Sequence, residues 1–211
     1  YQGLLFEATK HQITYQEQKT YFDVLRLTVD DKYSWDFAML GVGLRYINGV
    51  GKPDMLHYVE SFGMEGHYDF ASNRGYIWSR TFPLLKRALL LGVGQDNFAY
   101  AFPNDDYVGK VNCGFNEQIV TKPHNMYLQI WVQDGLPALL AFLALYLLLF
   151  GRTIRKCFKK GKWNHSHKIS LAFLCGVSGY FVAGLANDSS ICVAPVFWVL
   201  FGVAFAVLRS E

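Results

Sequence analysis

Residues 136–150 read LPALLAFLALYLLLF, a run without a charged side chain. Two more uncharged runs follow, ISLAFLCGVSGYFVAGLA at 169–186 and ICVAPVFWVLFGVAFAVL at 191–208. A helix needs roughly 20 residues to cross a hydrocarbon core of ~30 Å. The two later runs are therefore long enough to span the membrane if the ends of their helices lie in the interfacial region. We expect the first helix to begin earlier, around residues 127–131, with its aromatic side chains at the membrane surface. The sequence therefore predicts three membrane spans, over about 135–150, 169–186 and 191–208.

The composition of the 211-residue chain supports this interpretation. Hydrophobic residues make up 52% and aromatic residues 17% of the sequence, which is more than a soluble domain usually carries. The same values exclude a disordered or fibrous chain, and a net charge of +3 is too small to indicate a nucleic-acid-binding protein. The alternative is a soluble domain that buries three uncharged helices in succession, which is uncommon at this length.

Basic residues concentrate between the first two apolar runs. Seven Lys and Arg residues and no acid lie within 151–168, whereas residues 1–136 hold 12 basic and 15 acidic residues. Short loops rich in Lys and Arg stay in the cytoplasm. Residues 1–134 and 187–190 are then predicted to be extracytoplasmic, and residues 151–168 cytoplasmic. Because a large outer region precedes the first span, we expect additional spans upstream, which would make this chain the C-terminal part of a longer protein.

The first part of the outer region has the pattern of strands. Apolar and polar residues alternate over 24–29 and again over 33–39, on either side of a turn at 30–32, which predicts a hairpin. A third strand through Leu44 and Tyr46 would extend the hairpin to a small meander.

The pattern becomes helical at residue 72. Ser72 or Asn73 is expected to cap a helix over 74–82, with Pro83 kinking or restarting it toward Leu91. The predicted fold class is a mainly α, polytopic membrane protein fragment with a large extracytoplasmic α+β region. The predicted domains are an outer strand region at 1–71, an outer helical and loop region at 72–134, and a membrane region at 135–211.

His124 is the first candidate for chemistry. It lies directly before the helix that leads into the first span, so a rigid element would hold its imidazole at the outer membrane surface. Histidine changes protonation near neutral pH, and a positioned general base contributes ~10²–10⁴ in rate. The alternative is a histidine that satisfies a backbone group at a helix start, and local sequence leaves both open.

Arg74 is the second candidate, at the start of the expected helix in SNRGYIW. Helix N-termini and guanidinium groups both suit phosphate oxygens, and Arg80 follows as a weaker candidate. The alternative for both is an ordinary solvated or interfacial arginine.

Other patterns indicate neither a metal nor a cofactor. The glycines within residues 57–69 favour a loop, and no metalloprotease spacing occurs there, although the segment is rich in metal-ligand types. GVGQDNF at 92–98 lacks the third glycine of a dinucleotide fingerprint and is interpreted as a turn. The cysteines form no CxxC pair and no disulfide framework. The residues of metal-ligand type within residues 57–69 are His57, Glu60, Glu65, His67 and Asp69.

Four segments follow one another along the chain: SNRGYIW (72–78), LLLGVGQDNF (89–98), KPHNMYLQIWVQDGLPALLAFL (122–143) and NDSSICVAPVFWVLFG (187–202). Taken in this order, they resemble the C-terminal half of the O-antigen ligase family, bacterial membrane proteins that include O-antigen ligases and polysaccharide polymerases. The similarity covers roughly residues 72–208. In two places the chain departs from the family pattern: Asn73 stands where glycine is usual, and Gln133 replaces an acidic residue beside Asp134. The strand-rich region 20–50 has no counterpart that we recognise.

The resemblance implies a metal-independent membrane glycosyltransferase on the outer face of the bacterial plasma membrane. Its donor would be a glycan on undecaprenyl diphosphate, and its acceptor a hydroxyl of a glycan or glycolipid. His124 matches the family histidine proposed as the base. Arg74 matches the arginine proposed to hold the lipid diphosphate, with Arg80 as an aid. Asn125 and Asp188 are further candidates for orienting His124 or binding sugar.

Two alternatives remain open at this point. The chain could polymerise repeat units instead of ligating finished chains, and nothing in the sequence separates these two reactions. It could also be a non-catalytic transporter or scaffold. Transporters more often carry ionisable groups within their spans, and the three apolar runs contain none.

Overall fold

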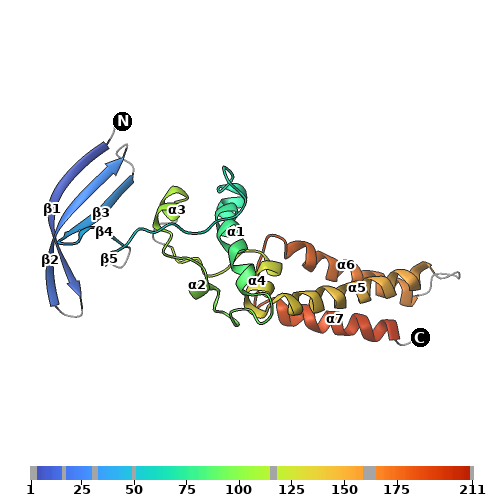
Figure 1. Ribbon diagram of the computed structural model, residues 1–211. Coiled ribbons are helices and arrows are strands. Elements are labelled where there is room, and N and C mark those ends of the chain that lie inside the picture. Colours follow the sequence, from blue (N-terminus) through green and yellow to red (C-terminus); the bar gives the residue numbers. More distant parts are fainter. Residues whose placement is uncertain are drawn as a thin grey trace. The chain divides into compact units, whose positions relative to one another are not determined.

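A sheet and a set of helices make up the computed structural model, which describes residues 4–15, 18–29, 33–48, 51–114, 118–158 and 165–209 (Figure 1). The chain forms two compact units. The first comprises Tyr1–Val59 with Asp105–Gln118, and the second comprises Glu60–Asn104 with Ile119–Glu211. A segment from the middle of the chain thus joins the strands in the first unit. The expected divisions after residues 71 and 134, which separate outer regions from a membrane region, stay predictions.

The first unit contains a five-stranded antiparallel sheet in the order β1-β2-β3-β4-β5. The hairpin predicted over 24–39 is confirmed, and Leu25 pairs with Phe37 in it. The third strand through Leu44 and Tyr46 is also confirmed, whereas the first and last strands were not predicted. The strands are β1 (Leu4–Tyr15), β2 (Gln18–Val29), β3 (Tyr33–Leu40), β4 (Gly43–Ile47) and β5 (Pro53–Asp54).

Cross-strand contacts explain the order of this sheet. Arg26 and Asp36 lie directly opposite each other and form a bidentate ion pair, with Nε 2.7 Å from Oδ1 and Nη2 2.8 Å from Oδ2. The hydrogen bond to Asp36 raises the pKa of Arg26. A short helix, α3 (Tyr107–Asn112), packs the ring of Tyr107 against that of Tyr46, with 4.7 Å between centroids and the ring planes tilted by 41°. This contact brings residues 105–118 into the first unit.

The second unit begins with α1 (Phe70–Arg87), whose regular geometry starts at Arg74 as predicted. Ser72 and Asn73 do not act as extended caps: their φ angles are 59° and 65°, in the left-handed region. Pro83 neither ends nor restarts this helix. Proline removes the hydrogen bond to the carbonyl four residues earlier, and that carbonyl, of Ser79, accepts instead from the backbone N–H of Phe62 at 2.8 Å. The loop before α1 therefore satisfies the group that Pro83 leaves free.

The prediction that one helix runs from about residue 127 through the first span is wrong. The structure has two helices, α4 (Met126–Asp134) and α5 (Leu136–Phe158), which are separated at Gly135. Gly135 has a φ of 93°, which side chains rarely allow, and a Cβ there would collide with the carbonyl of Leu90. The apolar sequence pattern of a helix therefore continues across Gly135, whereas the helical backbone is interrupted there.

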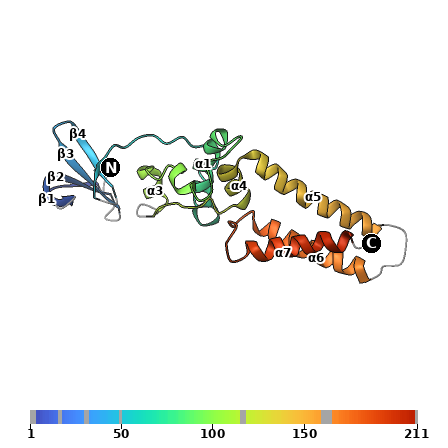
Figure 2. The ribbon, with the colours of Figure 1, turned by 90° about the horizontal axis from the view of Figure 1, so that it is seen from below.

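Helices α6 (His165–Ala183) and α7 (Ala194–Arg209) complete the second unit and lie beside α5 (Figure 2). Their shared core is aromatic, with Phe142 stacked on Phe181 at 4.7 Å and Tyr180 stacked on Phe197 at 4.1 Å. Such pairs stabilise by roughly 0.5–1.5 kcal/mol beyond the area they bury. The short helix α2 (Phe98–Ala101) lies ahead of this bundle in the chain.

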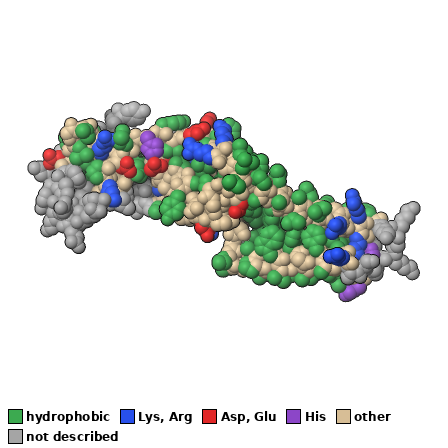
Figure 3. All heavy atoms as spheres, turned by 60° about the horizontal axis from the view of Figure 1, so that its bottom comes forward, with side chains coloured by type: hydrophobic (Ala, Val, Ile, Leu, Met, Phe, Trp, Pro, Cys, Tyr) green, Lys and Arg blue, Asp and Glu red, His purple; other side chains and the backbone are tan. Residues whose placement is uncertain are grey.

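The outer face of α5, α6 and α7 is also hydrophobic (Figure 3). Leu147, Leu148, Val182 and Val199 are all exposed there. Among the described residues, α5 alone is both long and apolar enough to cross a membrane, and α7 is apolar but shorter. The three-span arrangement therefore stays a prediction.

Candidate active site

His124 lies immediately before α4 in an unusual backbone conformation. Its φ is 51°, a left-handed value that is uncommon outside glycine. The peptide before it is held firmly: Pro123 is buried, and its carbonyl accepts a hydrogen bond from Trp78 Nε1 of α1 at 2.8 Å. The turn thus presents a half-exposed imidazole from a fixed segment.

Asn125 fastens this turn to two helices. Its Oδ1 accepts from the backbone N–H groups of Tyr127 and Leu128, both at 3.0 Å, so it caps α4. Its Nδ2 donates to the carbonyl of Leu185 at 2.9 Å, beyond the end of α6. The Met126 N–H also donates to the carbonyl of Gly184, at 2.8 Å. The start of α4 is therefore joined to the connection between α6 and α7.

This joining brings His124 next to Asp188. His124 Nδ1 lies 2.9 Å from Asp188 Oδ2, and the carboxylate side chain is only 11% exposed while the imidazole is 48% exposed. An ionised carboxylate accepts hydrogen bonds only, so Nδ1 carries the proton in the neutral imidazole and Nε2 keeps its lone pair. The other carboxylate oxygen, Oδ1, is buried and finds no hydrogen-bond partner within the described part of the chain.

A further residue that sequence reasoning missed holds the Asp188 turn in place. Gln129 is buried in α4, and its Oε1 accepts from the backbone N–H of Ser189 at 2.9 Å. The Ser189 hydroxyl lies 3.0 Å from that of Tyr180 in α6. The available signal was that Gln129 follows Asn125 by one helical turn and so shares its face of α4.

Arg74 lies on the face of α1 that meets the His124 segment. It precedes Trp78 by four residues, so both side chains occupy one helix face, and Trp78 bonds the residue before His124. Arg74 Nη1 donates to the carbonyl of Ala71 at 2.9 Å. Its Nε is buried with no hydrogen-bond partner among the residues that the structure describes. The guanidinium therefore retains donor capacity.

Arg80 lies on a different face of the same helix. Its guanidinium is buried between the rings of Tyr68 and Tyr76, at 4.8 and 4.6 Å from their centroids. Nη1 also donates to the Ser79 hydroxyl at 2.9 Å. The structure therefore does not bring Arg80 and Arg74 to one surface.

The metal-ligand types within residues 57–69 are dispersed. His57 Nε2 pairs with Asp105 at 3.2 Å in the first unit, and in the second unit Glu60 lies 4.0 Å from Lys86. Across the described residues, no three His, Cys, Asp or Glu side chains gather closely enough to hold a metal ion.

The segment GVGQDNF forms a turn, as predicted, and it packs against the end of α4. Val93 and Gly94 donate backbone hydrogen bonds to the carbonyls of Val132 and Gln133, at 2.8 and 2.9 Å. Gln95 Nε2 donates to Asp134 Oδ1 at 2.6 Å. The turn thus contacts the break between α4 and α5.

Comparison with known proteins identifies the family. A family model described as O-antigen ligase matches residues 33–143, more than half of the chain. The chain belongs to the O-antigen ligase family. Comparisons with curated proteins and with solved structures found no match.

The O-antigen ligase match begins at β3 and ends in α5. It therefore includes strands that we could not relate to the family from sequence alone, together with His124, Asn125, Arg74 and Arg80. Asp188 lies beyond it. The family has a membrane glycosyltransferase-like role in polysaccharide biosynthesis, with lipid-linked polysaccharide substrates.

Proposed function

We propose that this O-antigen ligase family member transfers a glycan from an undecaprenyl-diphosphate-linked donor to an acceptor hydroxyl. The reaction would occur on the outer face of the bacterial plasma membrane, with residues 1–134 and 187–190 extracytoplasmic and 151–168 cytoplasmic. The single observation that carries the proposal is the 2.9 Å contact between His124 Nδ1 and Asp188 Oδ2. It leaves the exposed side of an oriented imidazole available to an acceptor.

In the proposed step, His124 acts as the general base. Its Nε2 takes the proton of the acceptor hydroxyl while that oxygen attacks the anomeric carbon of the donor sugar. The bond from the anomeric carbon to the diphosphate oxygen breaks, and undecaprenyl diphosphate leaves with the bonding electron pair. Asp188 stabilises the imidazolium that forms, as a buried carboxylate does beside other catalytic histidines.

The developing charge on the diphosphate requires fixed cations. Arg74 is assigned this role because it lies on the face of α1 that reaches the His124 segment and has an unused donor. Arg80 is assigned a supporting role in holding α1, because two tyrosine rings enclose it. Asn125 positions His124 through its hydrogen bonds to α4 and to Leu185.

The test uses the full-length protein in its own cell. We expect His124→Ala and Arg74→Ala each to abolish polymer-linked product while lipid-linked intermediates accumulate, at unchanged membrane levels of the protein. The length of those intermediates separates ligation of finished chains from polymerisation of repeat units. An unchanged surface polysaccharide profile in both variants would favour a transporter or scaffold instead.

A further inference from the structure

Three consecutive leucines follow α1 and are exposed. Leu89, Leu90 and Leu91 are 49%, 75% and 87% exposed, whereas Ala88 directly before them is fully buried. Single exposed leucines are ordinary on a protein surface, but a run of three is unfavourable in water unless another apolar surface covers it. Residues 89–91, the leucine loop, therefore indicate a contact with an apolar partner.

Backbone hydrogen bonds hold the leucine loop against the break between α4 and α5. The Leu136 N–H, at the start of α5, donates to the carbonyl of Leu89 at 3.2 Å. Just after the loop, the Val93 N–H donates to the carbonyl of Val132 in α4 at 2.8 Å. The exposure of the three leucines is therefore a property of the fold, and their backbone lies level with the first residue of α5.

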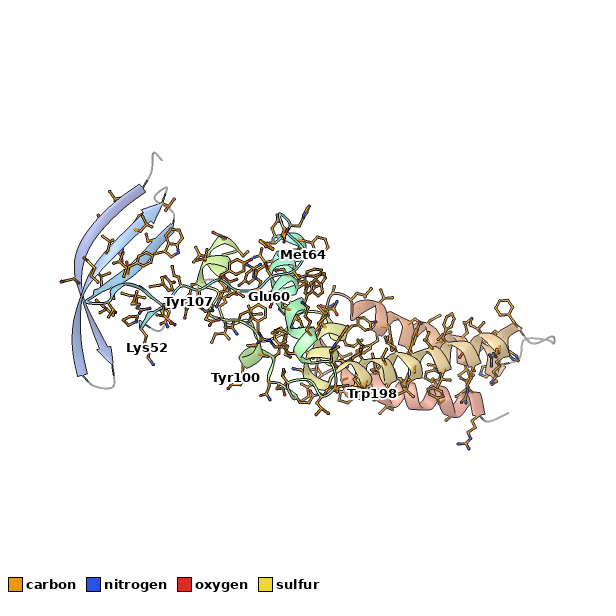
Figure 4. All side chains as sticks on the ribbon, in the orientation of Figure 1. Lys52, Glu60, Met64, Tyr100, Tyr107 and Trp198 are labelled. Carbon is orange, nitrogen blue, oxygen red and sulfur yellow. The ribbon has the colours of Figure 1, made fainter. Side chains whose placement is uncertain are left out.

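That level coincides with the expected boundary of the membrane. Helix α5 is long and apolar enough to cross a bilayer. Its uncharged part runs from Leu136 to Gly151, about 24 Å at a rise of ~1.5 Å per residue, which is less than the ~30 Å of a hydrocarbon core. Because Arg152 ends this part on the other side, the hydrocarbon layer must reach the level of Leu136 and of the leucine loop. Trp198 of α7 is 48% exposed near the α4 end of the bundle (Figure 4), and tryptophan is enriched at membrane surfaces.

Positive charge lies directly before the leucine loop. Lys86 and Arg87 occupy the last turn of α1, and both are exposed. In the sequence, no acidic residue lies between Asp69 and Asp96. Lipid phosphates lie just outside the hydrocarbon layer, and Lys or Arg beside inserted apolar side chains is typical of membrane-surface anchors. The two cations thus favour a phospholipid surface over a purely apolar protein surface.

We propose that the leucine loop inserts into the membrane leaflet at the start of α5, which the topology predicts to be the outer leaflet. The three leucine side chains enter the hydrocarbon layer, and Lys86 and Arg87 contact lipid phosphates at its surface. The loop thereby fixes the C-terminal end of α1, the helix that carries Arg74, at the membrane. This inference requires α5 to cross the membrane, but it does not depend on the proposed reaction.

The test measures lipid contact at one position of the loop. Leu91→Cys, in a full-length protein whose own cysteines are replaced by serine, is labelled with nitrobenzoxadiazole and reconstituted into phospholipid vesicles. A second set of vesicles contains phospholipids with a nitroxide on the acyl chain near the headgroup. Tyr100→Cys is the matched control, because Tyr100 is 89% exposed and lies on α2, on the side of α4 away from the bundle (Figure 4). We expect the label at position 91 to emit at shorter wavelength and to lose intensity with the nitroxide lipid, and the label at position 100 to do neither.

Three results would overturn the inference. Emission and quenching at position 91 equal to those at position 100 would place the loop in water or make the contact unspecific. A shift to shorter wavelength without quenching would show that another segment of protein covers the leucines. Quenching without a shift would place the loop beside the bilayer and not within it. The measurement needs no substrate, so a failure of the proposed reaction leaves its outcome unchanged.

Discussion

A left-handed turn at His124 and a cap at Asn125 have different consequences for the same loop. The left-handed backbone at His124 sets the direction of its side chain, and the peptide before it is fixed by Trp78. The cap uses both ends of the Asn125 amide, one on α4 and one on the connection after α6. Neither residue alone would bring the histidine to Asp188, since one sets its direction and the other its position.

Asp188 should act through the histidine that it contacts. We expect Asp188→Asn to lower the initial rate of glycan transfer on the order of 100-fold or more, because the amide cannot stabilise the imidazolium. Asp188→Glu should recover part of the loss, since the charge returns. The measurement is transfer in isolated membranes at equal protein levels.

The matched control for this prediction is Asp69→Asn. Asp69 is an exposed acid in the region predicted to be extracytoplasmic, and it caps nothing with its side chain. Its replacement should leave the rate within about twofold, as surface substitutions away from special features usually do. An Asp188→Asn variant as active as this control would remove Asp188 from the mechanism.

The break between α4 and α5 depends on how closely the backbones approach. Gly92 and Gly135 both have positive φ, at 64° and 93°, and each meets a backbone segment where a Cβ would collide. The Leu136 N–H donates to the carbonyl of Leu89 at 3.2 Å across this junction. The glycines therefore allow the end of α4, and with it the loop of the candidate active site, to be placed against the end of α1.

Gly135→Ala should disrupt this junction. The added methyl group collides with the Leu90 carbonyl, and a positive φ for alanine costs about 1–2 kcal/mol by itself. We expect a lower unfolding temperature and a smaller amount of protein in the membrane. Gly151→Ala is the control, because Gly151 lies within α5 and has open space around its Cβ position. Equal stability of the two variants would contradict the role of the close approach.

The contact between α3 and the sheet should respond to acid. Tyr107 Oη donates to Asp54 Oδ2 at 2.7 Å, and this bond is the main cause that holds the pKa of Asp54 below its usual value. Burial, together with that bond, raises the pKa of Tyr107 to about 12. A lowered carboxyl pKa stabilises the folded state above the unfolded value, and the effect is lost as the pH falls through the folded value.

Tyr107→Phe removes this contribution at every pH. Hydrogen exchange of residues 43–54 in the full-length protein should therefore differ between wild type and variant most strongly above about pH 4, and the difference should shrink below it. Tyr100→Phe serves as the control, since Tyr100 is 89% exposed. A difference that is as large at pH 3 as at pH 6 would exclude the Asp54 bond as its source.

At the scale of the whole molecule, the predicted topology places the C-terminal end of α5 and the connection between α6 and α7 on opposite sides of the membrane. Asn187→Cys and Arg155→Cys, both at exposed positions, test this in a full-length protein whose own cysteines are replaced by serine. In right-side-out vesicles, an impermeant maleimide should label Asn187→Cys directly and Arg155→Cys only after permeabilisation. Labelling of both without permeabilisation would contradict the topology.

The sequence by itself determined the apolar runs, the hairpin over 24–39 and the family, because composition, alternation and motif order are local properties of a chain. It also marked His124 and Arg74. Only the tertiary structure decided which partners they have. The contact of His124 with Asp188 depends on α4 packing against the connection between α6 and α7, and the enclosure of Arg80 by two tyrosines depends on a loop folding back on α1. No local pattern records such long-range packing, and for the same reason a single apolar periodicity concealed the break at Gly135.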